Sequence, residues 1–359
     1  MKYLLSFVSI ACAILLAVVT LNWAIDPAGL FSTNSFGKQF ASRLVSSENG
    51  LLLPDSVDER EFKKFLASMP SSADCIVVGS SHVMEIGSAR RHRSFPECRQ
   101  ILNLGVSGAG IEDLYVLTWL SVKSNQPKTL VLEIAPWTLA FGKDARWNAR
   151  YPEDYDTALS IIGPGQAAST TVEKQSRWST LVSAQYARRS LAAIRKRDTS
   201  HAIVPAPPTD EDTGGQLPII LSDGSLIYSA EYIANSKKSA VPLGGSDYKN
   251  SAPTNEAGAL LAFQHLVLWV RAQGVDPVLL LTPYHQNVWQ LENATTVQLM
   301  KESEKLAIEI GIKLEVSVVG SYHPERTGCL PDEFYDFMHP NAKCLARMTG
   351  KATSWSRQH

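Results

Sequence analysis

The chain has 359 residues, of which 45% are hydrophobic and 19% are charged. A chain of this length and composition can bury a sizeable core, which excludes global disorder. The 34 Lys and Arg residues nearly balance the 35 Asp and Glu residues, and the formal net charge is -1. A protein that neutralises many phosphates normally carries a basic excess, so we expect no nucleic-acid partner.

The N-terminus carries an apolar run from Tyr3 to Ile25 behind the single charge of Lys2. As one helix rising ~1.5 Å per residue, this run spans a hydrocarbon core of roughly 30 Å. Secretory signals have a shorter apolar core and a small-x-small cleavage site, which this run lacks near its end. We therefore predict an uncleaved single-pass anchor over residues 1–26, with a cleaved signal peptide as the alternative. Lys2 favours an inner (cytoplasmic) membrane protein whose bulk faces the periplasm or cell exterior.

Short apolar runs then alternate with segments of helical spacing over residues 71–359, after a predicted linker and lead-in helix at 27–70. Strands separated by helices predict a parallel sheet with helices on both faces, an α/β three-layer sandwich. The predicted strands are 75–79, 101–104, 129–134, 277–281 and 313–316, and the predicted helices are 110–120, 255–272 and 294–310, the last stopped by Gly311.

Residues from about 137 to 254 interrupt this alternation, and we predict that they form an insertion. Its Pro-rich stretch at 205–208 predicts a surface loop. An amphipathic basic helix is predicted near 181–197, where the cationic side chains form either a solvated face or a contact with anionic polymer or lipid headgroups.

Four cysteines lie outside the apolar run, and an even number permits two disulfides in an oxidising compartment. Cys75 and Cys98 each precede a predicted strand, and neighbouring parallel strands would bring them close. Cys329 and Cys344 flank one loop. We predict these two pairs, with four free thiols as the alternative.

Polar segments follow the strands at the edge where such sheets bind ligands. The first strand runs into Gly79-Ser80-Ser81-His82, the second into Asn103-Leu104-Gly105-Val106-Ser107-Gly108, and Asp336-Phe337-Met338-His339 follows the last strand. Each segment alone is commonly a structural turn or cap. Their joint occurrence, in this order and at these strand ends, favours a catalytic site.

A serine nucleophile needs a base within hydrogen-bond reach, and the base needs an acid that orients it. We predict Ser81 as nucleophile and His339 as general base. Asp336, three residues before His339, would fix its tautomer. The backbone amides of Ser81 and Gly108 would form the oxyanion hole.

This layout resembles the SGNH (GDSL-like) hydrolase superfamily, whose fold is a flavodoxin-like three-layer sandwich. The resemblance covers residues 75–134 and 255 to about 348. It implies that Ser81 is the nucleophile, with Ser80 where the family usually has Asp. It also implies that Gly108 is the oxyanion glycine and that Asp336 and His339 are the acid and base.

One family block, Gly-x-Asn-Asp after the third strand, is absent, because this strand runs into Glu133-Ile134-Ala135-Pro136-Trp137. The usual asparagine oxyanion donor is therefore missing or supplied from elsewhere. Together with Gly-Ser-Ser and an N-terminal anchor, this loss is similar to cell-envelope branches of the superfamily, namely alginate O-acetylation proteins and the teichoic-acid D-alanyl transfer protein. Such relatives move acyl groups onto or off envelope polymers.

Four further residues are candidates for substrate binding. Ser80 and His82 flank the nucleophile, and His285 ends the fourth strand. Trp137 could form a sugar-stacking wall or pack in the core, and His82 could line the site or only cap and pack. The sequence contains no zinc-ligand spacing and no nucleotide-binding loop, so we expect neither a metal nor another cofactor.

The sequence thus predicts a serine esterase or O-acyltransferase, with acetyl as the favoured acyl group, acting on an exported or cell-envelope polysaccharide. The predicted partners are an acylated polymer, the membrane and a membrane-bound acyl donor protein. The alternatives are a non-catalytic polysaccharide-binding or assembly component that retains the fold, and a lipid esterase at the membrane surface.

Overall fold

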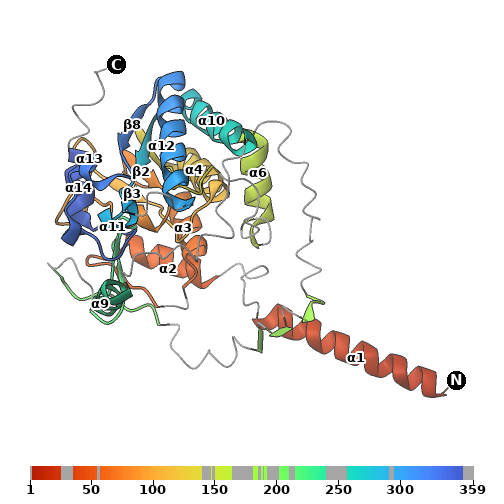
Figure 1. Ribbon diagram of the computed structural model, residues 1–359. Helices are drawn as coiled ribbons and strands as arrows, with labels where there is room; N and C mark the ends of the chain where they lie inside the picture. Colours follow the sequence, from red (N-terminus) through yellow and green to blue (C-terminus); the bar gives the residue numbers. More distant parts are fainter. Residues whose placement is uncertain are drawn as a thin grey trace.

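The computed structural model describes residues 2–25, 35–54, 57–139, 147, 150–163, 181–184, 187–188, 190–191, 202–209, 215–239, 257–290 and 295–350. Within these residues the chain forms an α/β domain and a long N-terminal helix that projects from it (Figure 1). The predicted three-layer architecture is confirmed.

The centre of the domain is a five-stranded parallel sheet. Its strands are hydrogen-bonded in the order β3 (Ile101–Asn103), β2 (Cys75–Val78), β4 (Thr129–Glu133), β7 (Asp276–Leu281) and β8 (Ser317–Gly320). Numbered along the chain, this order is 2-1-3-4-5, that of flavodoxin-like doubly wound sheets. The point where the winding direction switches, at which such folds bind ligands, lies between β2 and β4.

Side chains that alternate along the strands are buried on both faces of the sheet. One face, with Ile76, Leu130 and Leu279, packs against α4 (Ile111–Asn125), α10 (Ala257–Ala272) and α12 (Thr295–Leu314). The other face, with Val77 and Val131, packs against α14 (Ala342–Gly350) and the segment that follows β2. The short helices α11 (Gln286–Trp289), α13 (Pro324–Thr327) and η3 (Pro331–Glu333) complete the C-terminal half.

The end of α12 corrects one sequence prediction. The helix does not stop at Gly311 but runs to Leu314, and the strand predicted at 313–316 is found at 317–320. Gly311 is needed for packing, because a Cβ there would lie 2.4 Å from Val318 Cγ2. Glycine thus marks a close approach of helix and strand here, rather than a helix end.

The segment predicted as a linker and lead-in helix contains two helices, α2 (Phe36–Val45) and α3 (Glu59–Ser68), and the strand β1 (Leu51–Leu52). The two helices pack together through Phe40 and Phe62, whose ring centroids lie 5.3 Å apart. β1 pairs antiparallel with β5 (Ile219–Ile220), which pairs with β6 (Leu226–Ile227) from the insertion. The lead-in segment and the insertion therefore share a small second sheet.

The described part of the insertion adds two helices, α6 (Pro152–Ile162) and α9 (Ala230–Ser239). In the Pro-rich stretch, Pro205 forms a β-bridge with Leu51. Most of the basic helix predicted at 181–197 lies outside the described residues; of that range only 181–184, 187–188 and 190–191 are described.

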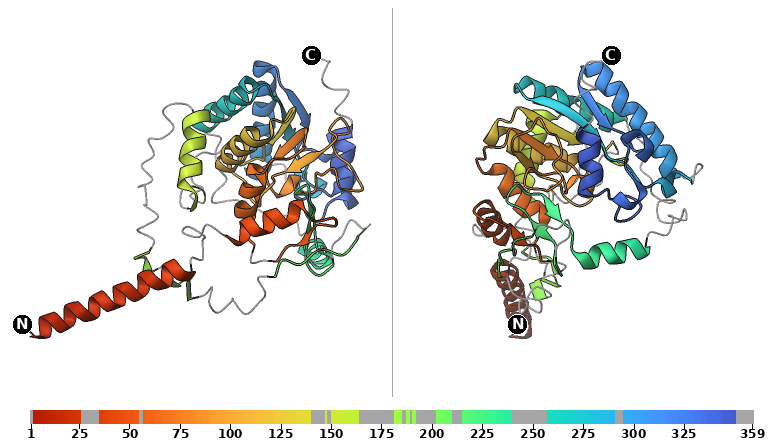
Figure 2. Two further views of the ribbon diagram at one scale, coloured as in Figure 1. Left: turned by 180° about the vertical axis from the view of Figure 1, so that it is seen from behind. Right: turned by 90° about the vertical axis from the view of Figure 1, so that its left-hand side faces the viewer.

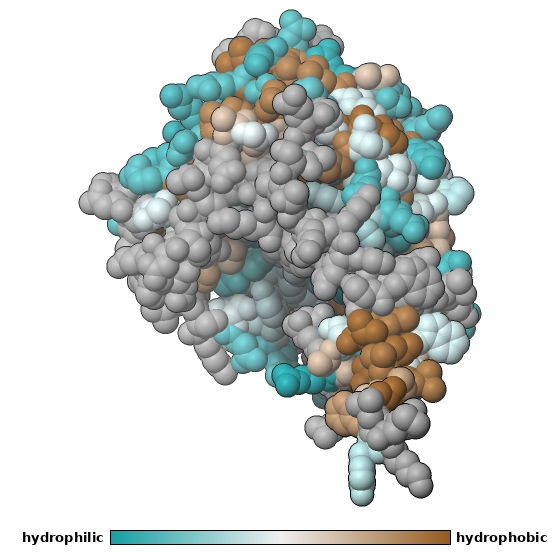
Figure 3. All heavy atoms as spheres, turned by 90° about the vertical axis from the view of Figure 1, so that its right-hand side faces the viewer, coloured by the Kyte–Doolittle hydropathy of each residue, from teal (hydrophilic) through white to brown (hydrophobic). Residues whose placement is uncertain are grey.

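Helix α1 (Lys2–Ile25) is apolar and exposed along most of its length, and it projects from the domain in each ribbon view (Figure 2). Its apolar side chains gather on the part of the molecule that extends below the domain in Figure 3. By length and composition α1 could span a membrane or serve as a signal sequence.

A buried lysine joins α3 to the central sheet and to the insertion. Lys63 is 1% exposed, and its Nζ donates hydrogen bonds to the carbonyl oxygens of Asn103 (2.8 Å) and Gly224 (2.6 Å). Burial lowers the pKa of Lys63 to about 7, although the nearby charges of Glu59 and Asp223 act in the opposite direction. The ammonium form is therefore disfavoured in the folded state.

Both predicted disulfides are present, Cys75–Cys98 and Cys329–Cys344. The first ties the start of β2 to the segment before β3. The second closes the loop that contains Asp336 and His339.

Replacing either cysteine pair by serine should lower the free energy of unfolding by about 3 kcal/mol, because crosslinks across 23 and 15 residues restrict the unfolded chain. Denaturant unfolding of each double variant under non-reducing conditions measures this. Unchanged midpoints for both variants would contradict the prediction.

Lys63 should make the free energy of unfolding depend on pH above neutrality. Between its folded pKa of about 7 and its ordinary value of 10.5, the unfolded chain binds more protons, so the free energy of unfolding rises with pH by at most about 1.4 kcal/mol per unit. Comparing Lys63→Met with the unaltered chain from pH 7 to 9 isolates this slope. Parallel pH profiles for the two proteins would show that Lys63 titrates normally.

Candidate active site

The chain turns sharply after β2 and brings Ser81 to the switch point of the sheet. Ser81 begins the single 3₁₀ turn η1 (Ser81–Val83). Ser80 is 1% exposed, and its hydroxyl accepts a hydrogen bond from the His82 amide (3.3 Å). Ser80 thus caps the turn, while Ser81 is half-buried.

The structure brings together the three residues of the predicted triad. Ser81 Oγ lies 2.9 Å from His339 Nε2, and His339 Nδ1 lies 2.7 Å from Asp336 Oδ2. The other carboxylate oxygen of Asp336 accepts the backbone amides of Met338 and His339, each at 2.7 Å. The acid is therefore fixed by its own loop as well as by the base.

Asp336 is held in its ionised form. Burial alone would raise its pKa, but the hydrogen bond from His339 and those from the two backbone amides outweigh burial, so the pKa lies below its usual value. An ionised Asp336 keeps a proton on Nδ1 of His339. Nε2 then faces the Ser81 hydroxyl as an acceptor, as a general base requires.

The predicted oxyanion glycine lies on a loop that α3 holds in place. Gly108 has a φ of +57°, which favours glycine, and a Cβ there would meet no atom within 4 Å. Glu59 accepts the amide (2.7 Å) and the hydroxyl (3.1 Å) of Ser107. Arg60 donates to the Ser107 carbonyl (3.1 Å) and forms a two-pronged ion pair with Asp113. The residue before Gly108 is thus held at all its polar groups.

Sequence reasoning missed the central role of Glu133, which ends β4 on the other side of the switch point. Its side chain is 1% exposed. Its carboxylate accepts hydrogen bonds from the Ser80 amide and from the Thr282 hydroxyl (3.0 Å), and it lies 3.3 Å from Nδ1 of His82. Gly79 permits this contact, because a Cβ there would lie 2.5 Å from Glu133 Cβ and Oε2. Glu133 therefore joins the ends of β2, β4 and β7.

Glu133 is ionised although it is buried. Burial would raise its pKa, but the hydrogen bonds that it accepts from His82 and from the Ser80 amide outweigh burial, so the pKa lies below its usual value. A sequence signal did exist. An acidic residue at the carboxyl end of a fully buried apolar strand needs polar partners, which points to a functional position.

His82 is buried beside the triad, at 1% exposure. Burial lowers its pKa against the opposing effect of Glu133, so the ring is neutral, with its proton on Nδ1 toward Glu133. Its ring meets the rings of His339 (5.1 Å), Trp137 (5.6 Å) and Tyr284 (5.2 Å) edge-on. Nε2 has no hydrogen-bond partner among the residues that the structure describes.

Two other candidates have structural contacts. Trp137 donates from Nε1 to the Ala109 carbonyl (2.8 Å), which links the loop after β4 to the loop of Gly108. His285 caps α11, because its Nδ1 accepts the Asn287 amide (3.1 Å), and its ring packs against Phe334. Trp137 thus lies at the border of the site, where it packs against His82. His285 instead holds the C-terminal loop in place through its contacts with Asn287 and Phe334.

Tyr228, from the insertion, was not predicted. Its hydroxyl donates to the Ser81 carbonyl (3.4 Å), and its ring centroid lies 6.1 Å from that of His339. It is buried at 8% exposure, and burial is the largest of the causes that raise its pKa well above the usual value. No motif in the sequence links this tyrosine to Ser81, which lies 147 positions earlier in the chain.

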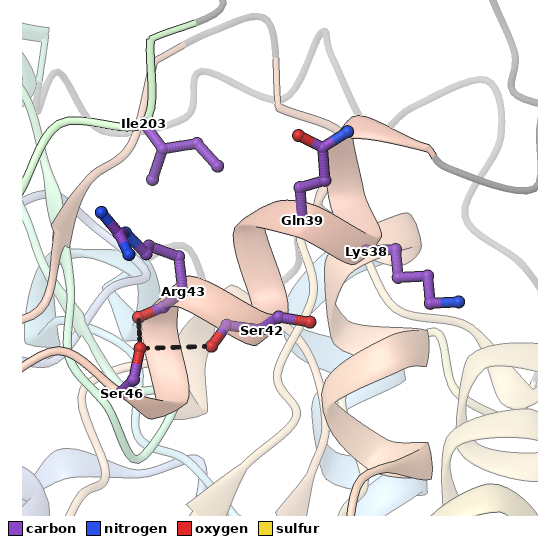
Figure 4. A pocket seen from close by; sticks show the side chains of 6 residues that line it. All are labelled: Lys38, Gln39, Ser42, Arg43, Ser46 and Ile203. Atoms are coloured by element: carbon purple, nitrogen blue, oxygen red, sulfur yellow. Dashed lines mark hydrogen bonds between the residues drawn. The ribbon is translucent and has the colours of Figure 1, made fainter.

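Two surface pockets lie apart from the triad. One, of about 460 Å³, lies on the outer side of α2 (Figure 4) and is lined by Lys38, Gln39, Ser42, Arg43, Ser46 and Ile203. The other lies between α4 and α10 and is lined by Trp119, Val122, Lys123, Gln126, Ile161, Trp269, Gln273 and Val275. In the described part of the chain, no group of three or more His, Cys, Asp and Glu residues is arranged to hold a metal ion.

No protein-family model matches the chain, and no curated protein matches its sequence. The chain is similar to solved structures of variants of an acetylxylan esterase from Geobacillus stearothermophilus. Two give TM-scores of 0.39 and 0.37 at 10% identity, and a third gives 0.35 at 11%. Each similarity covers 81% of this chain and 97% of the other. Values this low do not transfer an activity or a substrate.

Glu133→Gln should slow Ser81-dependent ester cleavage by about 10- to 100-fold, because the amide cannot accept from all three donors and the turn of Ser81 shifts. Release of p-nitrophenol from p-nitrophenyl acetate by the full-length protein in detergent measures this.

Glu304→Gln is the matched control. Glu304 is also a buried carboxylate that accepts a hydroxyl and a backbone amide, from Ser321 (2.8 Å) and Tyr322 (3.2 Å), but it does not contact the Ser81 turn. Thermal unfolding of both variants separates loss of fold from loss of activity. Equal rate losses in the two variants would refute a specific role of Glu133.

Proposed function

We propose that this protein is a membrane-anchored serine esterase or O-acyltransferase that acts on an exported or cell-envelope polysaccharide, with acetyl as the favoured acyl group. The observation that carries the proposal is the continuous line of contacts from Ser81 Oγ to His339 Nε2 (2.9 Å) and from His339 Nδ1 to Asp336 (2.7 Å). This is the geometry that activates a serine hydroxyl. The family resemblance of the sequence motifs supports the same assignment.

In the proposed reaction, Ser81 Oγ attacks the ester carbonyl while its proton passes to His339 Nε2. Ionised Asp336 stabilises the resulting imidazolium, and the backbone amides of Ser81 and Gly108 stabilise the oxyanion. His339 then returns the proton to the departing alcohol, which leaves an acyl group on Ser81. Water or a sugar hydroxyl, deprotonated by His339, then attacks this acyl-enzyme, the bond between the acyl group and Ser81 Oγ breaks, and His339 returns the proton to Oγ. The nature of the acceptor distinguishes hydrolysis from transfer.

The proposed location is the inner membrane, with the domain in the periplasm or outside the cell. Helix α1 is long and apolar enough to span the bilayer. The two disulfides suit an oxidising compartment, since they rarely persist in the cytosol. For a transferase, a membrane-bound protein that carries the acyl group is the proposed donor.

Ser81→Ala should lower p-nitrophenyl acetate hydrolysis by at least about 10³-fold, because it removes the atom that forms the acyl-enzyme. It should also abolish covalent labelling by a fluorophosphonate probe. Ser80→Ala removes the cap of the turn and the hydrogen bond of the Ser80 hydroxyl to Glu133, but it leaves the Ser81 hydroxyl in place and should still be labelled.

Three results would contradict this assignment. If the unaltered protein cleaves neither the test ester nor acetylated polysaccharides, a non-catalytic polymer-binding component fits better. Labelling that is lost with Ser80 rather than Ser81 would move the nucleophile by one residue. A strong preference for long-chain lipid esters would favour a lipid esterase.

A further inference from the structure

The insertion presents a pair of stacked tyrosines beside the triad. Tyr228 follows β6 and is buried against Ser81 and His339, as described above. Tyr232, one turn further along the chain in α9, stacks on Tyr228 with 4.7 Å between ring centroids and 15° between ring planes. α9 lies below α11 and α14 in Figure 1. Because Tyr228 contacts Ser81 and Tyr232 is the more exposed of the two rings, the stack leads from Ser81 outward.

The ring of Tyr232, the outer ring of the stack, is exposed to solvent, whereas that of Tyr228, the inner ring, is buried. Tyr232 is 36% exposed and Tyr228 only 8%. The Ser229 hydroxyl accepts the Tyr232 amide (3.1 Å), which fixes the start of α9. The inner ring also packs edge-on against Tyr335, at 5.3 Å. Tyr232 is thus a preorganised aromatic surface that needs no rearrangement to receive a ligand.

This surface lies on the side of the triad, because Tyr232 stacks on Tyr228, whose ring centroid is 6.1 Å from that of His339. Burial raises the pKa of Tyr232, and the next largest cause is the negative charge of Asp336. On α9, Ser236 hydrogen-bonds to the Tyr232 hydroxyl and the exposed Asn235 lies three positions on, so polar groups border the ring. An alkyl chain gains little in such a partly wet position. A sugar ring can rest its apolar C–H face on the aromatic ring and keep its hydroxyls in water.

We propose that Tyr232, stacked on Tyr228, is a subsite that binds the sugar ring of an acylated saccharide and directs its ester toward Ser81. This inference rests on the proposed function and specifies its substrate: the insertion recognises the carbohydrate part of the ester rather than the acyl group. The pair of stacked tyrosines lies outside the segments that carry the resemblance to the hydrolase superfamily.

The test compares an ester that carries a sugar ring with one that lacks it. For Tyr232→Ala, kcat/KM for glucose pentaacetate should fall about three- to tenfold more than kcat/KM for p-nitrophenyl acetate, mainly through KM. Tyr232→Phe keeps the ring and should restore the ratio, whereas Tyr232→Leu should not. Leu261→Ala, which alters an exposed apolar side chain on α10, is the control for a surface truncation.

A binding measurement separates this inference from the proposed function. Ser81→Ala should not turn over glucose pentaacetate, and its saturation-transfer NMR signal with that probe should weaken when Tyr232→Ala is added. An unaltered protein without esterase activity would refute the proposed function, while loss of the NMR signal on adding Tyr232→Ala would still support the subsite. Equal losses for both esters, a Tyr232→Phe variant as impaired as Tyr232→Ala, or a selective loss for p-nitrophenyl octanoate would overturn the subsite.

Discussion

A buried negative charge sets the geometry of this site. Glu133 lies at 1% exposure between the ends of three strands, where an unpartnered carboxylate would be strongly destabilising. Its oxygens must therefore be met by donors, and these come from the Ser80 amide, the Thr282 hydroxyl and the His82 ring. The turn that carries Ser81 can adopt few other positions without breaking one of these contacts. The direction of the Ser81 side chain follows from this constraint.

The central sheet supplies only part of the site. The loop of Gly108 is held by Glu59 and Arg60 of the lead-in segment, and the Ser81 carbonyl is contacted by Tyr228 of the insertion. Asp336 and His339 lie in a loop closed by a disulfide. The lead-in segment and the insertion, which the family resemblance does not cover, thus contact the loop of Gly108 and the turn of Ser81.

Most of the sheet could be predicted because buried parallel strands are short apolar runs that end in glycine or polar turns. Convergence of Ser81, His339 and Asp336 could be predicted because these segments share one edge of the sheet. The last strand was misplaced because Gly311 signals close packing as well as helix termination. Glu133 could have been found from its place at the carboxyl end of a buried apolar strand, whereas Tyr228 was missed because no motif in the insertion links it to Ser81.

One polar residue near the end of α1 ties the apolar helix to the rest of the chain. Asn22 is fully buried, and its amide donates to the Leu181 carbonyl (2.8 Å) and accepts the hydroxyl of Ser190 (3.0 Å). Removing residues 1–25 would take away this partner of Leu181 and Ser190. The end of α1 is therefore also a structural component of the insertion. A shortened form without α1 would lack these contacts, so its properties could differ from those of the full-length protein.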